Sequence, residues 1–476
     1  MGILYRPDDG YAADFIPLYD QGNYHLFYLK DYRDVPGHGE GTPWWHLVTR
    51  DFVHFEDWGE ALPRGPQGSQ DLWVFTGSAI AHQGQYHIYY TGHNHHLKDQ
   101  GKPVQAILHA TSPDTRTWTK DPGMAFFAPG ALGYEPDDWR DPFVFWNAEA
   151  GEFWMLLAAR HSVGAARKNS GPSRNRGCTA LASSKDLATW TVREPFWEPD
   201  EFYTHECPDL FRLGDWWYLV FSEFTDRSMT RYRMSRSLRG PWLTPANDTF
   251  DGRAYYAAKT AGVGDERYVF GWLPTREGET DSGGWQWGGH LVTHQVIQRT
   301  DGTLAVRPPA TVLAPFVKPI TLTPRAVLGQ WHTEGAFSAD AVGRFSAATL
   351  AAMPDECLIQ AEITYAPGTA SCGLLLRADD TLDTYYQVRL EPAAQRMVID
   401  RWPRPGDQPF ILERPLAMQP DRPVRLRVLV DGTCLVVYAD DEVALCCRMY
   451  EHRTGALGLF VTEGAARFGK VTLSTR

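Results

Sequence analysis

Three acidic residues of this chain stand at the same phase of a repeated strand. Asp14, Asp141 and Glu206 each precede the aromatic third position of such a strand by 10 to 12 residues. If every repeat is one blade of a β-propeller, equivalent positions meet around the central axis, and the three carboxylates face one pocket. Glycoside hydrolysis requires one carboxylic acid to protonate the leaving oxygen and a second carboxylate as nucleophile or as base. The spacing therefore predicts a glycosidase site.

The neighbours of each carboxylate favour different roles. Glu206 lies among apolar and aromatic residues of the segment 203–211, where burial would favour the protonated carboxyl that a general acid needs. Arg140 directly precedes Asp141 and is expected to keep that carboxylate ionised, which suits ligand binding and charge stabilisation. Asp14 has no adjacent cation, so a role as nucleophile or as base stays open for it.

The strands that must position these residues recur five times. Each is a run of aromatic and aliphatic residues without a polar face, as a middle strand packed between two neighbouring blades requires. The repeated strands are residues 22–28, 84–90, 151–157, 215–221 and 266–272. At the phase of the carboxylates, the second repeat carries Phe75 and Ser78 and the fifth carries Tyr256 and Lys259. These four residues are predicted to complete the pocket wall.

The chain as a whole is predicted to be an all-β protein. Helical periodicity is scarce, and short β-rich runs alternate with turns that contain Gly, Pro, Asp and Asn. The repeats predict a five-bladed β-propeller over residues 1–315. Residues 316–330, which include two prolines, are predicted to be a linker. Alternating strands over residues 331–476, two of them joined by the turn Asp431-Gly432, predict a C-terminal β-sandwich.

The composition excludes several function classes. The net charge is −12 and no run of Lys or Arg stands out, so nucleic acid is not an expected partner, because phosphate binding requires a basic face. No uncharged apolar run reaches about 18 residues, so no membrane span is expected. The seven cysteines show no C-x-x-C spacing and the first residues have no apolar signal core. Reduced thiols in the cytoplasm are therefore expected.

Several segments resemble glycoside hydrolase family 32, which contains invertases, levanases and inulinases. Residues 139–142 resemble the family's Arg-Asp-Pro motif, and residues 205–211 resemble its Glu-Cys motif with the following Pro-Asp-Leu-Phe. Residues 75–79 are similar to its Phe-Ser-Gly-Ser-Ala segment, and residues 45–55 to the family segment that begins Trp-Gly-His. The matches follow one another in order through most of the chain, and the Glu-Cys motif is the most specific of them.

The resemblance implies an exo-acting, retaining enzyme for small fructosides or fructo-oligosaccharides, with fructosyl transfer as a further activity and no cofactor. It implies that Asp14 is the nucleophile, Asp141 the transition-state stabiliser and Glu206 the acid/base. Residues expected to contact the carbohydrate are Trp45, Phe75, Ser78, Arg140, His205, Tyr256, Lys259 and Trp287. For His205 and Trp287 a structural role is an equal alternative.

The region around Asp14 departs from the family's pattern. The family's nucleophile motif is Trp-Met-Asn-Asp-Pro-Asn-Gly, whereas residues 11–17 read Tyr-Ala-Ala-Asp-Phe-Ile-Pro and lack both Asn residues and the Gly. The Gln expected after Tyr28 is also absent. Two alternatives therefore stay open. One is an inverting furanosidase of the arabinofuranosidase type, which shares the five-bladed fold, and the other is a propeller that binds sugar without catalysis.

Other polar segments are given lesser roles. His93 to His96 could suggest a metal, but they follow a repeated strand on a loop, so no metal site is expected. Residues 168–176 form a basic segment that is interpreted as a solvated loop over or beside the pocket. Blade loops, this segment or a neighbouring subunit of a homo-oligomer are the candidates for closing the pocket. A closed pocket in the cytoplasm predicts an imported di- or oligosaccharide as substrate.

Overall fold

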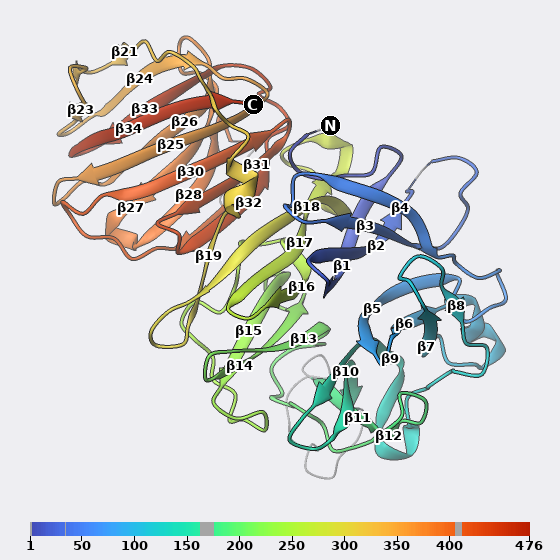
Figure 1. The fold of residues 1–476 in the computed structure, drawn as a ribbon. Coiled ribbons are helices and arrows are strands. Elements are labelled where there is room, and N and C mark those ends of the chain that lie inside the picture. Colours follow the sequence, from blue (N-terminus) through green and yellow to red (C-terminus); the bar gives the residue numbers. More distant parts are fainter. Residues whose placement is uncertain (1, 34, 162–175, 405–411) are drawn as a thin grey trace.

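A computed structural model describes residues 2–33, 35–161, 176–404 and 412–476. The regular secondary structure of this part is almost entirely β-strand, arranged as two bodies that lie side by side in Figure 1. The basic segment 168–176 falls almost wholly outside the described residues. Within the described part, no helix is long and apolar enough to cross a membrane.

The N-terminal body contains five groups of antiparallel strands, one for each predicted repeat. Blade 1 contains β1 (Tyr11–Asp20), β2 (Asn23–Asp31), β3 (Trp44–Thr49) and β4 (Phe55–Leu62). Blade 2 contains β5 (Trp73–His82), β6 (Gln85–His93), β7 (Gln105–Ser112) and β8 (Thr119–Lys120). Blade 3 contains β9 (Tyr134–Asn147), β10 (Glu152–His161), β11 (Gly177–Ser184) and β12 (Thr191–Val192). Blade 4 contains β13 (Glu206–Leu213), β14 (Trp216–Glu223) and β15 (Met229–Ser235). Blade 5 contains β16 (Tyr256–Val263), β17 (Glu266–Arg276), β18 (Trp285–Gln298) and β19 (Leu304–Arg307).

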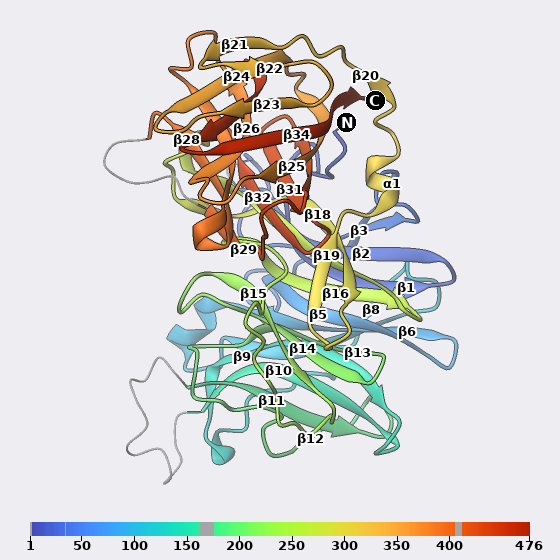
Figure 2. The ribbon, with the colours of Figure 1, turned by 90° about the vertical axis from the view of Figure 1, so that its left-hand side faces the viewer.

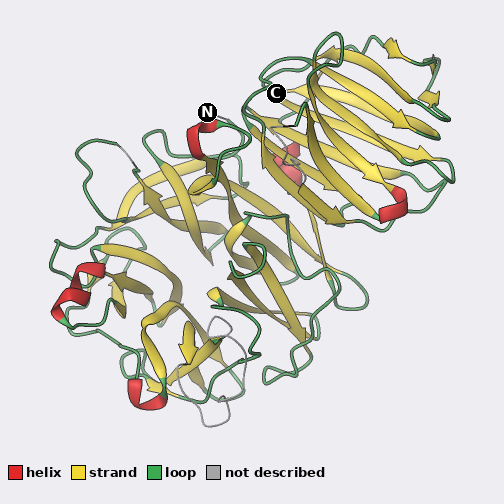
Figure 3. Cartoon of the chain, turned by 180° about the vertical axis from the view of Figure 1, so that it is seen from behind, coloured by secondary structure: helices red, strands yellow, loops and turns green. Residues whose placement is uncertain are grey.

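The five blades close into a ring around the first strand of each blade. β1 contacts β5, β5 contacts β9, β9 contacts β13, β13 contacts β16, and β16 contacts β1 again. Blades 1 and 5 are also joined through the pairing of β1 with β18, so their strands form one sheet. Viewed from behind, the strands surround a common centre (Figure 3). The predicted five-bladed propeller is thereby confirmed.

The middle strands explain why the repeated sequences have no polar face. β10 is buried at eight consecutive positions, and β2 at seven, because each blade packs against a neighbour on both sides. Burial of both faces removes apolar surface from water, and each Å² removed contributes about 25 cal/mol of stabilisation. This burial stabilises the ring of blades. The shared cores run from blade to blade: the aromatic Tyr89 of β6 packs within the cluster that contains β10 residues of blade 3.

The C-terminal body is a sandwich of two antiparallel sheets. The first sheet contains β22 (Trp331–His332), β23 (Phe337–Asp340), β34 (Ala465–Thr475), β25 (Glu356–Tyr365), β30 (Val424–Asp431), β31 (Cys434–Ala439) and β32 (Val443–Arg448), with β20 (Lys318–Pro319) paired to β34. The second contains β21 (Arg325–Leu328), β24 (Phe345–Ala352), β33 (Ala456–Thr462), β26 (Ser371–Ala378), β27 (Tyr385–Glu391), β28 (Arg396–Trp402) and β29 (Leu412–Pro415). Alternating apolar residues of both sheets fill one core. The predicted sandwich is confirmed.

The helices among the described residues are few and short. They are η1 (His95–Gln100), η2 (Gly130–Leu132), η5 (Glu277–Glu279), α1 (Ala310–Leu313) and η6 (Pro392–Ala394). α1 follows the last propeller strand, and β20 and β21 follow α1 along the segment 316–330 before the remaining sandwich strands begin. Figure 2 shows the sandwich stacked on the side of the propeller formed by blades 1 and 5.

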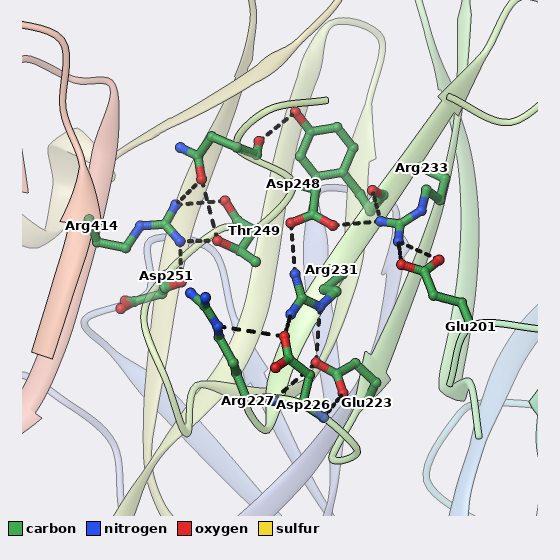
Figure 4. Close-up of polar contacts among 12 residues, drawn as sticks. Glu201, Glu223, Asp226, Arg227, Arg231, Arg233, Asp248, Thr249, Asp251 and Arg414 are labelled. Atoms are coloured by element: carbon green, nitrogen blue, oxygen red, sulfur yellow. Dashed lines mark hydrogen bonds and ion pairs between the residues drawn. The ribbon is translucent and has the colours of Figure 1, made fainter. Parts of the chain in front are cut away.

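Buried polar contacts join the two bodies. Arg414 of β29 is fully buried and donates hydrogen bonds to the Thr249 carbonyl at 2.8 Å and to the Asn247 side chain at 3.0 Å, both in blade 4 (Figure 4). His294 of β18 contacts the Tyr438 hydroxyl at 2.8 Å and the Asp251 carboxylate at 3.0 Å. Since buried polar groups are costly when unpaired, these contacts fix one orientation of the sandwich on the propeller.

Candidate active site

A β-bulge interrupts the innermost strand of every blade at the same place. The pairing register shifts after Ala13, Phe75, Arg140, Glu206 and Tyr256, so one extra residue is inserted there against the second strand. A bulge bends the strand and redirects the side chain of the inserted residue. The inserted residues of four blades, Asp14, Thr76, Asp141 and Cys207, line the cavity at the centre of the ring.

The residues at the bulges are Asp14, Thr76, Asp141, Cys207 and Ala257. Asp14, Asp141, Cys207 and Ala257 have positive φ angles of 45°, 58°, 50° and 49°. Positive φ is unfavourable for residues other than glycine and is concentrated at functional sites. Glu206 precedes the bulge residue of its blade, so it does not occupy the position of Asp14 and Asp141 but the one before it.

The bulges surround a cavity of about 770 Å³. Asp14, Asp141 and Glu206 all line it. The full lining is Asp14, Leu29, Asp31, Thr42, Trp73, Phe75, Thr76, Gln105, Asp137, Asp138, Arg140, Asp141, Tyr203, Glu206, Cys207, Phe224, Tyr256 and Trp287. The structure thus brings together the three carboxylates that lie 127 and 65 residues apart in the sequence.

Asp14 accepts hydrogen bonds from neighbouring blades on both carboxylate oxygens. The Thr76 hydroxyl donates to Oδ2 at 2.6 Å, and the Trp272 indole nitrogen donates to Oδ1 at 3.3 Å. The Cys207 thiol lies 4.0 Å from Oδ2. These donors fix the orientation of the carboxylate and favour its ionised form.

Asp141 is held on the other side of Cys207. The Cys207 amide donates to Asp141 Oδ2 at 2.9 Å, and the thiol lies 3.7 Å from the same oxygen. The Asp141 amide donates to the Thr91 hydroxyl at 2.7 Å, which anchors the backbone at the bulge. The Cys207 side chain therefore contacts one oxygen of each carboxylate, Asp14 Oδ2 and Asp141 Oδ2.

Glu206 is linked to the residues that precede the bulges in the two adjacent blades. Arg140 donates to Glu206 Oε1 at 3.0 Å, and the Tyr256 hydroxyl donates to Oε2 at 2.5 Å. Arg140 also donates to Asp138 at 2.7 Å, and its Nε lies 3.9 Å from Asp141. The side chain of Glu206 is 20% exposed, so it remains accessible from the cavity.

Burial and mutual repulsion raise the pKa values of two carboxyl groups. Burial raises the pKa of Asp14 to about 7, and the charges of Asp141 and Glu206 add to this, while the bonds from Thr76 and Trp272 oppose it. Burial likewise raises the pKa of Asp141 to about 6, against the opposing charge of Arg140. The expected effect of Arg140 on Asp141 is therefore present but smaller than that of burial. Acidic groups with raised pKa values gathered in one cavity are typical of catalytic sites.

The predicted sugar-contacting residues divide into two groups. Phe75, Arg140, Tyr256 and Trp287 line the cavity together with the three carboxylates. Trp45, Ser78, His205 and Lys259 do not line it.

Local packing explains these four positions. Ser78 and Lys259 lie two residues beyond the bulge residue, where the side chains pack between blades: Ser78 accepts from the Val144 amide at 2.9 Å, and Lys259 donates to the Pro208 carbonyl at 2.7 Å. His205 is fully buried beside the ring of Trp197. Trp45 lies on β3, the third strand of its blade, with the Lys30 ammonium over its ring.

The sequence interpretation missed several residues of the cavity. Thr76 and Cys207 occupy the bulge position of Asp14, and superimposing the repeats at their first strands would have identified both. Trp272, which contacts Asp14 but does not itself line the cavity, has no comparable signal, because it lies within β17, the second strand of blade 5, and reaches Asp14 only through the closure of the ring. The lining residues Asp31, Tyr203 and Phe224 come from loops or strand ends that carry no motif.

Two groups of side chains in the described part have donors suited to a metal ion. One is Glu40, His95 and His96, which are largely exposed, and the other is His161, Cys178 and Glu198. In the first group both imidazoles already contact the Glu40 carboxylate, at 3.3 and 2.9 Å. Neither group includes one of the three axial carboxylates, and acid–base chemistry at those carboxylates requires no metal.

Comparison with family models agrees with this geometry. Residues 5–308 match the model described as "Glycosyl hydrolases family 32 N-terminal domain", and residues 332–475 match the model described as "Glycosyl hydrolases family 32 C terminal". The chain belongs to glycosyl hydrolase family 32. The resemblance inferred from short motifs is thereby confirmed.

Curated relatives and solved structures of family 32 enzymes support the assignment. The chain is 29% identical to sucrose-6-phosphate hydrolase of Escherichia coli over 307 residues, which cover 60% of this chain and 59% of that protein. It is 28% identical to levanase of Bacillus sp. (strain L7) over 486 residues, or 92% of this chain and 47% of that protein. The chain thus spans about half to three fifths of the length of these relatives.

The fold is shared with solved structures along the whole chain. Sucrose-6-phosphate hydrolase from Lactobacillus gasseri superposes with a TM-score of 0.73 and 19% identity, covering 100% of this chain and 92% of that one. Exo-inulinase from Aspergillus awamori superposes with a TM-score of 0.72 and 19% identity, covering 100% and 98%. At this level of identity the likeness establishes the fold.

Proposed function

We propose that the chain is an exo-acting, retaining glycosidase that releases a terminal β-fructofuranosyl unit from small fructosides. The observation that carries the proposal is the meeting of Asp14, Asp141 and Glu206 in one cavity of a family 32 propeller. Relatives named sucrose-6-phosphate hydrolase, levanase and raffinose invertase support fructosides as the substrate class.

The proposed chemistry proceeds in two displacements. The ionised Asp14 carboxylate attacks the anomeric carbon, the bond from that carbon to the leaving oxygen breaks, and Glu206 gives its proton to this oxygen. Glu206 then removes a proton from water, the water oxygen attacks the anomeric carbon, and the ester bond to Asp14 breaks. When a sugar hydroxyl replaces water in the second step, the product is a transferred fructosyl unit.

The contacts of Glu206 suit an acid that must alternate between two protonation states. Arg140 stabilises the ionised carboxylate after the proton has left, and Tyr256 holds the second oxygen. Asp141 is proposed to accept hydrogen bonds from sugar hydroxyls and to stabilise positive charge at the anomeric carbon. Because Asp141 and Asp14 are both close to the axis, the terminal sugar is proposed to lie between them.

The altered segment 11–17 favours one second candidate. In place of the Asn residues of the family motif, Ala12 and Ala13 precede Asp14; both are fully buried, neither lines the cavity, and neither has a side-chain donor for a sugar hydroxyl. An inverting furanosidase with another specificity, of the arabinofuranosidase type, is therefore the alternative. NMR of the first-formed anomer separates the two: retention supports the proposal, and initial release of the inverted anomer contradicts it.

Two measurements test whether the site is catalytic at all. A screen of aryl furanosides and fructo-oligosaccharides should show turnover, and activity on a pyranoside alone would contradict the furanosidase assignment. Glu206→Gln should abolish turnover yet keep stabilisation by the ligand. A variant and wild type that behave alike in both assays would instead support a sugar-binding module without catalysis.

The domain division, the assembly state and the compartment are part of the proposal. We retain a propeller over residues 1–315, a connecting segment over 316–330 and a sandwich over 331–476. The buried free thiols include the adjacent Cys446 and Cys447, which suits a reducing cytoplasm and an imported substrate. A pocket that admits one terminal sugar predicts a higher kcat/KM on a disaccharide than on the matching polymer, whether blade loops or a second subunit close it.

A further inference from the structure

The mouth of the cavity carries an exposed aromatic platform. Phe224 lines the cavity and is 46% exposed, a high value for a large apolar side chain. Its ring centroid lies 5.4 Å from that of Tyr203, which also lines the cavity. The guanidinium carbon of Arg160 lies 3.6 Å from the Tyr203 ring centroid. The platform is defined here as Tyr203 and Phe224, with Arg160 supporting Tyr203.

A buried ionic network fixes the turn that carries Phe224. Glu223, which is fully buried, accepts from the Asp226 amide at 2.9 Å and from Arg231 at 3.0 Å, and Arg231 pairs with Asp226 at 2.9 Å (Figure 4). The Thr225 hydroxyl accepts from the Tyr203 amide at 2.8 Å, so the two parts of the platform are joined. An exposed ring on a turn fixed in this way is a preorganised binding surface.

The platform lies on the side of the cavity that the leaving group must occupy. Inner-strand residues just before the bulges, such as Arg140 and Tyr256, line the cavity, whereas Ser78 and Lys259 beyond the bulges pack between blades, so the cavity opens on the side that precedes the bulges. Tyr203 precedes Glu206 by three residues, whereas Asp14 and Asp141 lie at the bulges. A terminal sugar held between Asp14 and Asp141 therefore directs its leaving group past Glu206 toward the platform.

The charges at the mouth disfavour an anionic leaving group. Asp31, Asp137 and Asp138 line the cavity, while Arg140 is the one cation among the described lining residues. Nearby cations are already engaged, because Arg33 contacts Asp31 at 3.4 Å, Lys98 contacts Asp137 at 3.0 Å, and Arg160 contacts Asp138 at 3.5 Å. Among the residues that the structure describes, a phosphoryl group here would meet carboxylates without a free cation to receive it.

We propose that Phe224 and Tyr203 form a subsite for an uncharged leaving group with an apolar face, such as an unphosphorylated sugar ring, and that the acidic mouth selects against phosphorylated disaccharides. The inference rests on the proposed glycosidase function and specifies its substrate class. The C–H face of a sugar ring packs on an aromatic ring in the way that other apolar groups do.

The first experiment separates the leaving group from the rest of the substrate. Sucrose and methyl β-D-fructofuranoside share the fructosyl unit, but only sucrose carries a ring that reaches the platform. Phe224→Ala should lower kcat/KM for sucrose about tenfold and leave the value for the methyl fructoside within about twofold. Phe224→Trp should retain sucrose activity. Phe127→Ala, which removes another exposed aromatic side chain (39%) outside the cavity lining, is the matched control.

The outcomes distinguish failure of the subsite from failure of the proposed function. Equal losses on both substrates, or no loss on either, would overturn the subsite. Absence of turnover of any furanoside by wild type would contradict the proposed function instead. In that case calorimetry of sucrose binding to Glu206→Gln, with and without Phe224→Ala, still tests the subsite: binding about tenfold weaker with Phe224→Ala supports it, and equal binding contradicts it.

The second experiment tests the charge selection. Sucrose should have a kcat/KM at least about tenfold higher than sucrose with a phosphate on O6 of its glucose. The difference should shrink at high ionic strength and in Asp137→Asn, which removes one carboxylate and releases Lys98. Equal or better use of the phosphorylated disaccharide would overturn the selection.

Discussion

Replacing Asp14 by Asn should make the protein more stable at alkaline pH while abolishing turnover. The pKa of Asp14 rises from 3.8 to about 7 because the folded chain removes water from it and places Asp141 and Glu206 nearby. In the unfolded chain the carboxyl loses its proton near pH 4, but in the folded chain it keeps the proton until about pH 7. The folded state therefore binds more protons between these values, and its stability falls as pH rises through this range.

The size of the effect follows from the shift. About three pKa units correspond to ~4 kcal/mol at 1.36 kcal/mol per unit, an upper bound because cavity water screens part of the charge. We expect the stability advantage of Asp14→Asn over wild type to be ~2 kcal/mol larger at pH 8 than at pH 5. Chemical denaturation at the two pH values measures this, with the exposed Asp8→Asn as control.

Asn retains an acceptor oxygen for one of the bonds from Thr76 and Trp272, so the packing around the bulge is largely conserved. If the stability advantage of Asp14→Asn is the same at pH 5 and at pH 8, the folded site does not raise the pKa of Asp14. If Asp14→Asn instead loses stability relative to wild type as the pH rises, the folded site lowers the Asp14 pKa, which is the opposite sign.

Three further predictions follow from the contacts described above. kcat/KM should rise with pH through about 7 as Asp14 ionises. Thr76→Val should move this rise to higher pH, because the hydrogen bond from Thr76 lowers the Asp14 pKa. A pH profile that is the same in Thr76→Val and in wild type would contradict the role of this bond. Wild type should lose stability as the pH falls from 6.5 to 4, because burial lowers the His87 pKa to about 4 and only the unfolded chain takes up that proton in this range. His87→Gln should reduce this loss, which chemical denaturation at the two pH values measures. Arg414→Met should destabilise the chain by ~3 kcal/mol, because it leaves buried acceptors of Asn247 and Thr249 without donors. An unchanged midpoint of thermal unfolding would show that this contact between the two bodies contributes nothing to stability.

The fold was predictable because its determinants are repeated in the sequence. Five apolar strands and the segments that precede them give five equivalent blades, and the closure of the ring follows from their number. The division into a propeller and a sandwich followed from a change in strand texture near residue 310. Each local signal is weak alone, but because it recurs in five repeats the fold could be predicted.

The site was predictable only in part, because phase in the sequence fixes the blade position but not the side-chain direction. Asp14 and Asp141 occupy the bulge, whereas Glu206 stands one residue earlier, a difference that counting from the next strand does not resolve. Ser78 and Lys259 lie within the predicted segments but point between blades. Trp272 reaches Asp14 through closure of the ring, and Phe224 reaches the cavity through a turn; neither event has a local sequence signal.

The repeated bulge also bears on how such a site can change its chemistry. The same register shift occurs at Asp14, Thr76, Asp141, Cys207 and Ala257, so the pairing of the blade strands and not one residue type produces the bulge. Carboxylate, hydroxyl, thiol and methyl groups already occupy equivalent bulge positions in this one chain. A substitution at one of these positions is therefore expected to change the group offered at the centre of the ring while the bulge is kept, so that specificity can change through single residues.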